Sequence, residues 1–247
     1  MEVKVDGVRI FFLKSDNIPI VYIHGSGCDA ELWKRQLEGV GGYAISLPNH
    51  GSSGRAEINS IDDYAYFVVR ASKKIVGKAI FVGHSLGGAI AQKVYTNHRD
   101  VVKALILVGT GVRLRVLPEL LKELRNNPER VVNTIVSMAF SKKIDDFEKI
   151  RKAFLKNSEI LLRDLEICDK FDLLEDCKND KIKIEVPTLI VVGENDKLTP
   201  VKYSEFLHQK IENSKLAILQ GGHMIMLEQP EKLNEAINKF IRDKELV

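Results

Sequence analysis

Cysteine is scarce in this chain, and no apolar run approaches the length of a membrane helix. The three cysteines, Cys28, Cys168 and Cys177, are an odd count without metal-ligand spacing. This is typical of free thiols, although a pairing of Cys168 with Cys177 stays open. A membrane helix needs about 20 consecutive apolar residues, and the first residues lack the basic start and apolar stretch of a secretory signal. We therefore expect a cytoplasmic protein without a membrane span.

Net charge is also low, at +3 over 247 residues. No long run of Lys and Arg marks a nucleic-acid patch, so we expect no nucleic-acid partner. Hydrophobic residues make up 45% and charged residues 29%, which is ordinary for a soluble globular protein. A chain of this length is routinely a single α/β domain with one large core.

Short apolar runs alternate with amphipathic segments along most of the chain. The apolar runs predict strands that are buried on both faces, and Asp6-Gly7 predicts a hairpin turn between the first two. Ser60 and Asp63 have capping-box spacing at the start of a helix. The predicted strands are 3–5, 8–13, 18–23, 43–47, 79–82, 101–108, 188–192 and 216–219, and the predicted helices are 30–37, 60–76, 89–97, 201–211 and 230–242. This alternation predicts an α/β fold, a mostly parallel twisted sheet with helices on both faces and an antiparallel hairpin at one edge.

The pattern changes between residues 112 and 184, where buried-strand runs are absent. Apolar residues recur there at helical spacing, and Pro118 and Pro128 stand at first helical positions. We expect about four helices, inserted between two sheet strands beyond the carboxyl ends where ligands bind in such folds. The predicted organisation is a core of residues 1–111 and 185–247 under a helical cap of residues 112–184.

The segment Gly83-x-Ser85-x-Gly87 follows a predicted buried strand and opens a helix. This is the context of a nucleophile elbow, a tight turn in which the serine backbone is strained and the flanking residues must be small. The turn places the serine hydroxyl at its tip, in front of a helix N-terminus. Ser85 is therefore the candidate nucleophile.

A serine hydroxyl needs a base to remove its proton, and the base needs a carboxylate to orient it. His223 lies in a glycine-rich loop after a predicted strand, and Asp196 directly follows the strand 188–192. Their order after Ser85 is the one required, and all three lie at carboxyl ends of strands. Glu194 is the alternative acid, two residues earlier.

Acyl transfer also needs hydrogen-bond donors for the developing oxyanion. The backbone N–H of Leu86, next after the nucleophile, is one candidate. The second should come from the loop after the strand 18–23, where we assign Ser26 with Gly27 as the alternative. We expect His24 to brace this loop.

Together these motifs resemble the α/β-hydrolase superfamily over nearly the whole chain. The markers are His24-Gly25, Leu47 to Ser53, Gly83 to Gly88, Gly193 to Asp196, and Gly222-His223 with Glu228 to Glu231. The resemblance is closest to small capped carboxylesterases and lipases of the Gly-His-Ser-Leu-Gly-Gly type. It implies a triad of Ser85, His223 and Asp196, and its spacing favours Asp196 as the acid. The chain departs from it at Ser46 and Asn49, where relatives often have Asp and Gly.

The expected activity is hydrolysis of a carboxylic ester through an acyl-enzyme on Ser85. His223 would serve as general base and acid, and Asp196 would orient it. An acyl-CoA thioesterase, a lactonase and a carbon–carbon bond hydrolase are alternatives on the same triad, and a slow-turnover ligand receptor is an alternative of another class. Haloalkane dehalogenases and epoxide hydrolases of this fold use Asp at the elbow, so Ser85 argues against both. We expect no cofactor and no metal.

Four residues are candidates for the substrate pocket: Gly27, Met138, Phe140 and Met224. For Met138 and Phe140, ordinary packing at helical spacing is an equally good interpretation. Lys and Arg exceed Asp and Glu between residues 112 and 165. A basic cap would favour anionic partners such as acyl-coenzyme A, although a solvated helical surface explains the same charges better.

Two further histidines are interpreted as structural. His84 is expected to be a packing residue with both ring nitrogens satisfied. His50 is expected to be a loop histidine without a ligand role.

Overall fold

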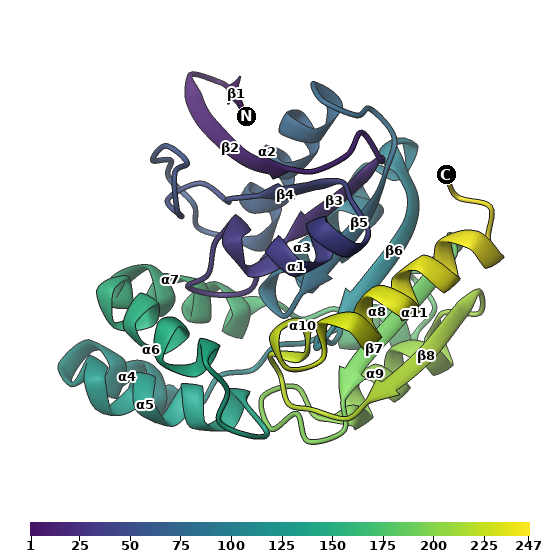
Figure 1. Ribbon diagram of the computed structural model, residues 1–247. Coiled ribbons are helices and arrows are strands. Elements are labelled where there is room, and N and C mark those ends of the chain that lie inside the picture. The colour runs from purple at the N-terminus through teal and green to yellow at the C-terminus, as the bar shows by residue number, and fades with distance from the viewer.

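Eight strands form one sheet in the computed structural model, which describes residues 1–247 (Figure 1). They are β1 (Glu2–Val5), β2 (Val8–Lys14), β3 (Ile20–Ile23), β4 (Tyr43–Ile45), β5 (Ala79–His84), β6 (Val102–Val108), β7 (Thr188–Gly193) and β8 (Ser214–Leu219). The order in the sheet is β1-β2-β4-β3-β5-β6-β7-β8. The hairpin β1-β2 joins β4 in antiparallel fashion and all other neighbours are parallel. The predicted mostly parallel sheet with an antiparallel edge is confirmed.

Helices cover both faces of this sheet. Those outside the insertion are η1 (Ala30–Trp33), α1 (Lys34–Gly39), α2 (Ile61–Lys73), α3 (Leu86–Asn97), η2 (Arg99–Val101), α9 (Val201–Lys210), α10 (Ile225–Glu228) and α11 (Pro230–Asp243). Alternate strand residues point to opposite faces. Val21 and Phe81 join the apolar cluster with α2 and α3, whereas Tyr22 and Val82 join the cluster with α1 and α11. Strands β3, β4, β5 and β7 are therefore buried along their whole length, because helices cover both faces, whereas the edge strand β8 is partly exposed.

Five helices lie between β6 and β7. They are α4 (Pro118–Asn126), α5 (Pro128–Ala139), α6 (Asp146–Lys156), α7 (Ser158–Lys170) and the short α8 (Leu174–Lys178). Pro118 and Pro128 begin α4 and α5, as their missing N–H groups favour. Figure 1 shows α4 to α7 gathered together at one end of the sheet. Apolar residues from α4 to α7 belong to the same buried cluster as α1 and α11, so these helices are packed onto the sheet domain.

Local sequence signals account for several boundaries. Ser60 caps α2, and its side chain and that of Asp63 form the predicted capping box. The helix predicted from residue 89 begins at Leu86, immediately after the candidate nucleophile. The single turn α10 has no periodic signal and was not predicted. Asn49 has a φ of 71°, and Asn tolerates this left-handed conformation better than other residues with a side chain, which explains its place where relatives often have Gly.

Candidate active site

Ser85 occupies the turn between β5 and α3 with φ 54° and ψ −115°. Such a backbone conformation costs on the order of 1–3 kcal/mol and is held only by its surroundings. A Cβ on Gly83 would overlap the Gly87 carbonyl, and one on Gly87 would overlap the Ile23 carbonyl. The strained turn is locked because Ser85 N–H donates to Val108 O at 3.0 Å. Gly83 and Gly87, which the motif predicts to be small, are required here because any side chain at either position would overlap backbone atoms.

His223 and Asp196 form a buried pair, each 5% exposed. The Nδ1 atom of His223 lies 2.8 Å from Oδ2 of Asp196. Burial alone would raise the pKa of Asp196, but His223 and the backbone N–H and hydroxyl of Thr199 hold it below its usual range. Glu194 is exposed and accepts from the Asn195 side chain. The structure thus brings Asp196, and not Glu194, to His223.

Thr199 completes this arrangement and was not predicted. Its hydroxyl donates to Oδ2 of Asp196 at 2.8 Å and lies 3.1 Å from Nδ1 of His223. The hydroxyl thus holds the carboxylate oxygen that faces the imidazole. The spacing Asp-x-x-Thr after a strand is a pattern for side-chain to backbone hydrogen bonds, and it is the only local signal for this residue.

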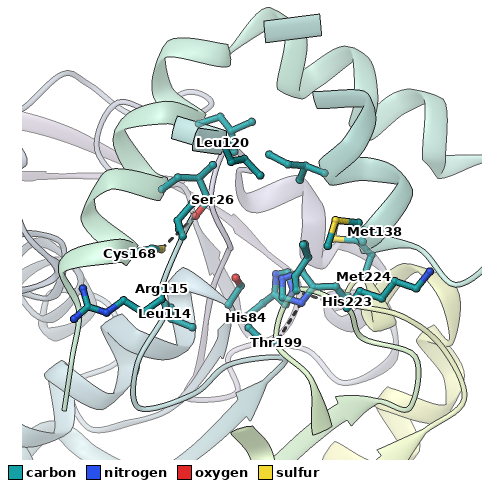
Figure 2. Close-up of a pocket in the computed structure, with 18 of the residues that line it drawn as sticks. Ser26, His84, Leu114, Arg115, Leu120, Met138, Cys168, Thr199, His223 and Met224 are labelled. Carbon is teal, nitrogen blue, oxygen red and sulfur yellow. Dashed lines mark hydrogen bonds between the residues drawn. The ribbon is translucent and has the colours of Figure 1, made fainter. Parts of the chain in front are cut away.

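Ser85 and His223 face one cavity of about 260 Å³, and 15 of its 22 lining residues are hydrophobic. Their side chains are not hydrogen-bonded to each other, and in enzymes without substrate such contacts are often long. Figure 2 shows Met138 and Met224 near His223, with Ser26 and Cys168 on the other side of the cavity. The cavity is therefore mostly apolar, and its polar lining consists of the candidate catalytic groups and their neighbours together with Arg115 and Lys197.

Two residues predicted for this pocket do not line it. The ring of Phe140 is 5% exposed and packs against Phe147, with 5.5 Å between ring centroids. Gly27 is not a lining residue, because Leu161 and Phe154, which line the cavity, fill the space where its side chain would be. The prediction was wrong for Phe140. Helical spacing shows that a residue is on the apolar face, but it does not show whether that face contacts the cavity or a neighbouring helix.

The loop after β3 presents the Ser26 N–H as a free backbone donor. Ser26 lines the cavity, and its N–H donates no hydrogen bond within the protein. The Gly27 N–H instead donates to Asp164 at 2.8 Å, so Gly27 is excluded as the alternative donor. Leu86 is the first residue of α3, and its N–H therefore has no acceptor inside the helix. The N–H groups of Ser26 and Leu86 are therefore both available as donors.

His24 braces this loop, as expected. Its Nδ1 atom lies 2.9 Å from Gly25 O, and its Nε2 accepts from Leu47 N–H at 3.1 Å. Since a carbonyl can only accept, the proton is on Nδ1 and the ring is neutral. Burial and the charge of His50 lower the pKa of His24 to about 3, which agrees with a neutral ring.

Of the other two histidines, His84 differs from expectation, and His50 is a loop histidine whose buried partner was not predicted. His84 Nε2 lies 3.1 Å from His223 O, but its buried Nδ1 has no partner, so the ring is only half satisfied. His50 is 2% exposed and lies 2.9 Å from the carboxylate of Asp164. Asp164 itself is fully buried, although its place among the charges of the insertion predicted a solvated surface. These contacts join distant segments, so local sequence could not reveal them.

Glu228 is a second buried carboxylate that was not assigned a role. It is 7% exposed and accepts from the backbone N–H of Gly222, directly before His223. Its other oxygen accepts from the Ser141 and Lys142 N–H groups at 2.8 and 3.2 Å. The loop that carries His223 is therefore tied to the segment between α5 and α6.

The cysteines form no disulfide, and two cationic side chains lie at the cavity. All three cysteines are free, so Cys168 and Cys177 do not pair. Arg115 and Lys197 line the cavity, and Arg115 is paired with Asp172 at 3.3 Å. No group of three or more His, Cys, Asp or Glu side chains has an arrangement suited to a metal ion. No helix has the length and apolar character to cross a membrane.

Comparison with known proteins agrees with this architecture. The alpha/beta hydrolase family matches residues 20–236, and the chain belongs to that family. A solved structure of a thermophilic esterase is 52% identical and superimposes with a TM-score of 0.97, covering 99% of this chain and 97% of that one. The predicted α/β-hydrolase fold is confirmed, and the protein is a hydrolase with esterase relatives.

More distant curated relatives carry out different reactions. The pimeloyl-[acyl-carrier protein] methyl ester esterase of Wigglesworthia glossinidia brevipalpis is 24% identical over 92% of this chain and 95% of that protein. The 2-hydroxy-6-oxo-6-(2'-aminophenyl)hexa-2,4-dienoic acid hydrolase of Metapseudomonas resinovorans is 25% identical over 97% of this chain and 89% of that protein. The family therefore fixes the class of enzyme and not the bond that is cleaved.

Proposed function

We propose that this protein hydrolyses carboxylic esters of small, apolar acyl groups through an acyl-enzyme on Ser85. The observation that carries the proposal is the buried His223–Asp196 pair at 2.8 Å, which opens onto the same apolar cavity as the strained Ser85. A nucleophile, a base with an orienting acid, and free backbone donors are the parts that acyl transfer needs.

The reaction proceeds in two steps. His223 takes the proton of the Ser85 hydroxyl as its oxygen attacks the ester carbonyl, and the alcohol leaves with that proton. Water then repeats the sequence on the acyl-enzyme, and the acid is released. The N–H groups of Leu86 and Ser26 hold the negative oxygen, and Asp196 stabilises the charged form of His223. The Thr199 hydroxyl donates to the Asp196 oxygen that faces the imidazole and so holds the carboxylate in position.

The cavity favours short or medium acyl chains. Its volume of about 260 Å³ is below the 300–1,000 Å³ or so of typical small-molecule sites. Met138 and Met224 line it, and their flexible side chains adapt to different acyl shapes. Long-chain esters would have to leave part of the chain outside.

Charge favours a neutral ester over an acyl-coenzyme A. The arginines of the insertion are largely engaged with carboxylates; the paired ones are Arg113, Arg115, Arg125, Arg130 and Arg151. Pairing reduces the positive potential that would attract an anionic carrier. A thioesterase is the second candidate, supported by Lys197, which lines the cavity from the loop between β7 and α9.

A panel of nitrophenyl esters from acetyl to palmitoyl, with acyl-coenzyme A thioesters beside it, tests the proposal. We expect turnover of the short and medium esters that is abolished in Ser85→Ala. Equal and negligible hydrolysis by wild type and Ser85→Ala would reject esterase activity and leave a slow-turnover receptor. A preference for thioesters by orders of magnitude would select the second candidate.

The acid is tested by a matched pair of variants two residues apart. Asp196→Asn should lower kcat about 10⁴-fold, because the imidazole loses its orienting acceptor. Glu194→Gln, on the exposed side of the same loop, should change it little. A greater loss in Glu194→Gln would overturn the assignment of Asp196.

A further inference from the structure

The loop that carries the Ser26 N–H is a tight turn over residues 25–28. Cys28 N–H donates to Gly25 O at 3.2 Å, and Gly27, at the third position, has a φ of 69°. A positive φ at this position is typical of a type II turn. Types I and II differ by a flip of the central peptide, here the one between Ser26 and Gly27. Whatever holds that peptide therefore sets the shape of the loop.

Both peptides around Ser26 are held by hydrogen bonds, the first by His24 and Cys28 and the second by Asp164. Gly25 O accepts from the His24 ring and from Cys28 N–H. Because a trans peptide directs its N–H opposite to its C=O, these bonds point the Ser26 N–H away from them. The next peptide is held by Asp164, which accepts the Gly27 N–H at 2.8 Å.

Asp164 reaches this loop from α7, within the insertion between β6 and β7. Its Oδ2 accepts from Gly27 N–H and faces His50 Nε2 at 2.9 Å, and its Oδ1 accepts from the Tyr64 hydroxyl at 2.7 Å. A buried carboxylate without partners would be strongly unfavourable, and here every partner is a donor. Leu161, one turn earlier on α7, packs against Gly27. Helix and loop thus meet at both residues.

His50 supplies the counter-charge. Its Nδ1 lies 2.8 Å from Pro48 O, and its Nε2 faces the Asp164 carboxylate. Both partners are acceptors, so both ring nitrogens carry protons and the ring is an imidazolium. The carboxylate and the imidazolium are each at most 1% exposed. Such a pair is costly to assemble and costly to break, which suits a fixed position rather than a mobile one.

We propose that Asp164 is a positioning residue for ester hydrolysis, carried by the insertion and holding the Ser26–Gly27 peptide, so that it fixes the turn that presents Ser26 N–H to the reacting oxygen. The inference rests on the proposed function. His50 keeps Asp164 ionised, and Tyr64 fixes the carboxylate from its other oxygen. The helical insertion then does more than cover the cavity, since it orders half of the oxyanion hole.

Asp164→Asn tests this role, because an amide cannot accept from all the donors that face it. Wild type and variant are compared on nitrophenyl butyrate and with phenylboronic acid, which forms a tetrahedral adduct with a nucleophilic serine. We expect kcat about 100-fold lower, KM within about threefold, and boronate affinity reduced by about the same factor as kcat. A merely structural role would lower stability without this split between kcat and KM.

Glu166→Gln is the matched control, since Glu166 lies on α7 and pairs with Arg125 near the surface. Its kcat and boronate affinity should stay within about twofold of wild type. If Asp164→Asn does not fold, His50→Gln replaces it. That variant leaves Asp164 without its counter-charge and should lower kcat about tenfold at unchanged KM.

The outcomes separate this inference from the proposed function. Wild-type hydrolysis that does not depend on Ser85 would reject the proposed function itself. Ser85-dependent hydrolysis, with kcat and boronate affinity of a folded Asp164→Asn within threefold of wild type, would reject only the positioning role. An unchanged kcat in His50→Gln would reject it as well.

Discussion

Ser141 donates both its backbone N–H and its hydroxyl to one oxygen of Glu228, each at 2.8 Å. The other oxygen accepts from Gly222, the residue before His223. Ser141 lies between α5 and α6, whereas Glu228 ends α10. A single buried carboxylate therefore joins the insertion to the loop of the candidate base.

Replacing Glu228 by Gln should destabilise the protein and weaken catalysis. The amide nitrogen would have to face an N–H on one of its two sides, which leaves a buried donor unpaired at about 1–3 kcal/mol. Urea unfolding measures the loss of stability, and kcat on nitrophenyl butyrate measures the displacement of His223. The exposed Glu231→Gln on α11 is the control, and equal effects in the two variants would contradict the prediction.

Gly87→Ala should destroy the turn at Ser85. Its Cβ would overlap the backbone carbonyl of Ile23, which cannot move without breaking the sheet, so we expect a loss of about 3 kcal/mol or more. Gly77 has a φ of 68° and open space around it, so Gly77→Ala should lose only the about 1–2 kcal/mol of a left-handed residue. Thermal unfolding compares the two, and a milder effect at Gly87 would show that the contact is relieved.

Thr199→Val should lower kcat about tenfold without loss of the fold, because Asp196 keeps its backbone donors but loses the hydroxyl that holds Oδ2. Steady-state kinetics on a short ester measures the effect. KM should change little, since the hydroxyl serves the base. A fall in binding alone would place Thr199 with the substrate instead.

The stabilising effect of His50 should depend on pH. Burial lowers the pKa of His50, but the Asp164 carboxylate, together with weaker effects of other neighbours, raises it by more, so the pKa in the folded protein lies above the unfolded value of 6.5. The contribution of His50 to stability is therefore complete below pH 6.5 and is lost as the pH rises through the folded pKa. The groups facing it are Asp164, Tyr64, Asp29 and the neutral His24. Asp164, with a lowered pKa, stays ionised in this range.

Urea unfolding of wild type and His50→Gln between pH 5 and pH 9 measures this difference. We expect the gap in free energy of unfolding to be greatest at pH 5 and to shrink at alkaline pH. A gap that is constant over the range would mean that His50 is not charged in the folded protein.

Met138 and Phe140 should differ in what they control. Met138 lines the cavity, so Met138→Ala should shift the ratio of kcat/KM for octanoyl over butyryl ester by about tenfold towards the longer chain. Phe140 packs against Phe147 outside the cavity, so Phe140→Leu should reduce stability by roughly 1 kcal/mol with a smaller change in that ratio. The reverse pattern would move Phe140 into the acyl site.

The sequence predicted those parts of the candidate site that depend on local patterns. The glycines around Ser85 and the strand ends before Asp196 and His223 are visible over a few residues. The Asp164–Gly27 contact joins positions 137 residues apart in the sequence, and no spacing pattern predicts it. A buried aspartate on a charged helix also looks like its solvated neighbours until tertiary packing is known. The prediction for Phe140 was wrong for the same reason, because the side to which its ring points depends on its packing against Phe147 of the neighbouring helix.

The location of Asp164 limits how this enzyme can diversify or be redesigned. Replacing residues 112–184 as one module by the helices of a relative would remove Asp164. His50 would then be a buried cation without a counter-ion, and the Gly27 N–H would have no acceptor. A chimera needs a carboxylate at the equivalent turn of its own helix before any new specificity can be expressed. Changes made side chain by side chain along the cavity wall escape this constraint, so they are the shorter route to a new acyl preference.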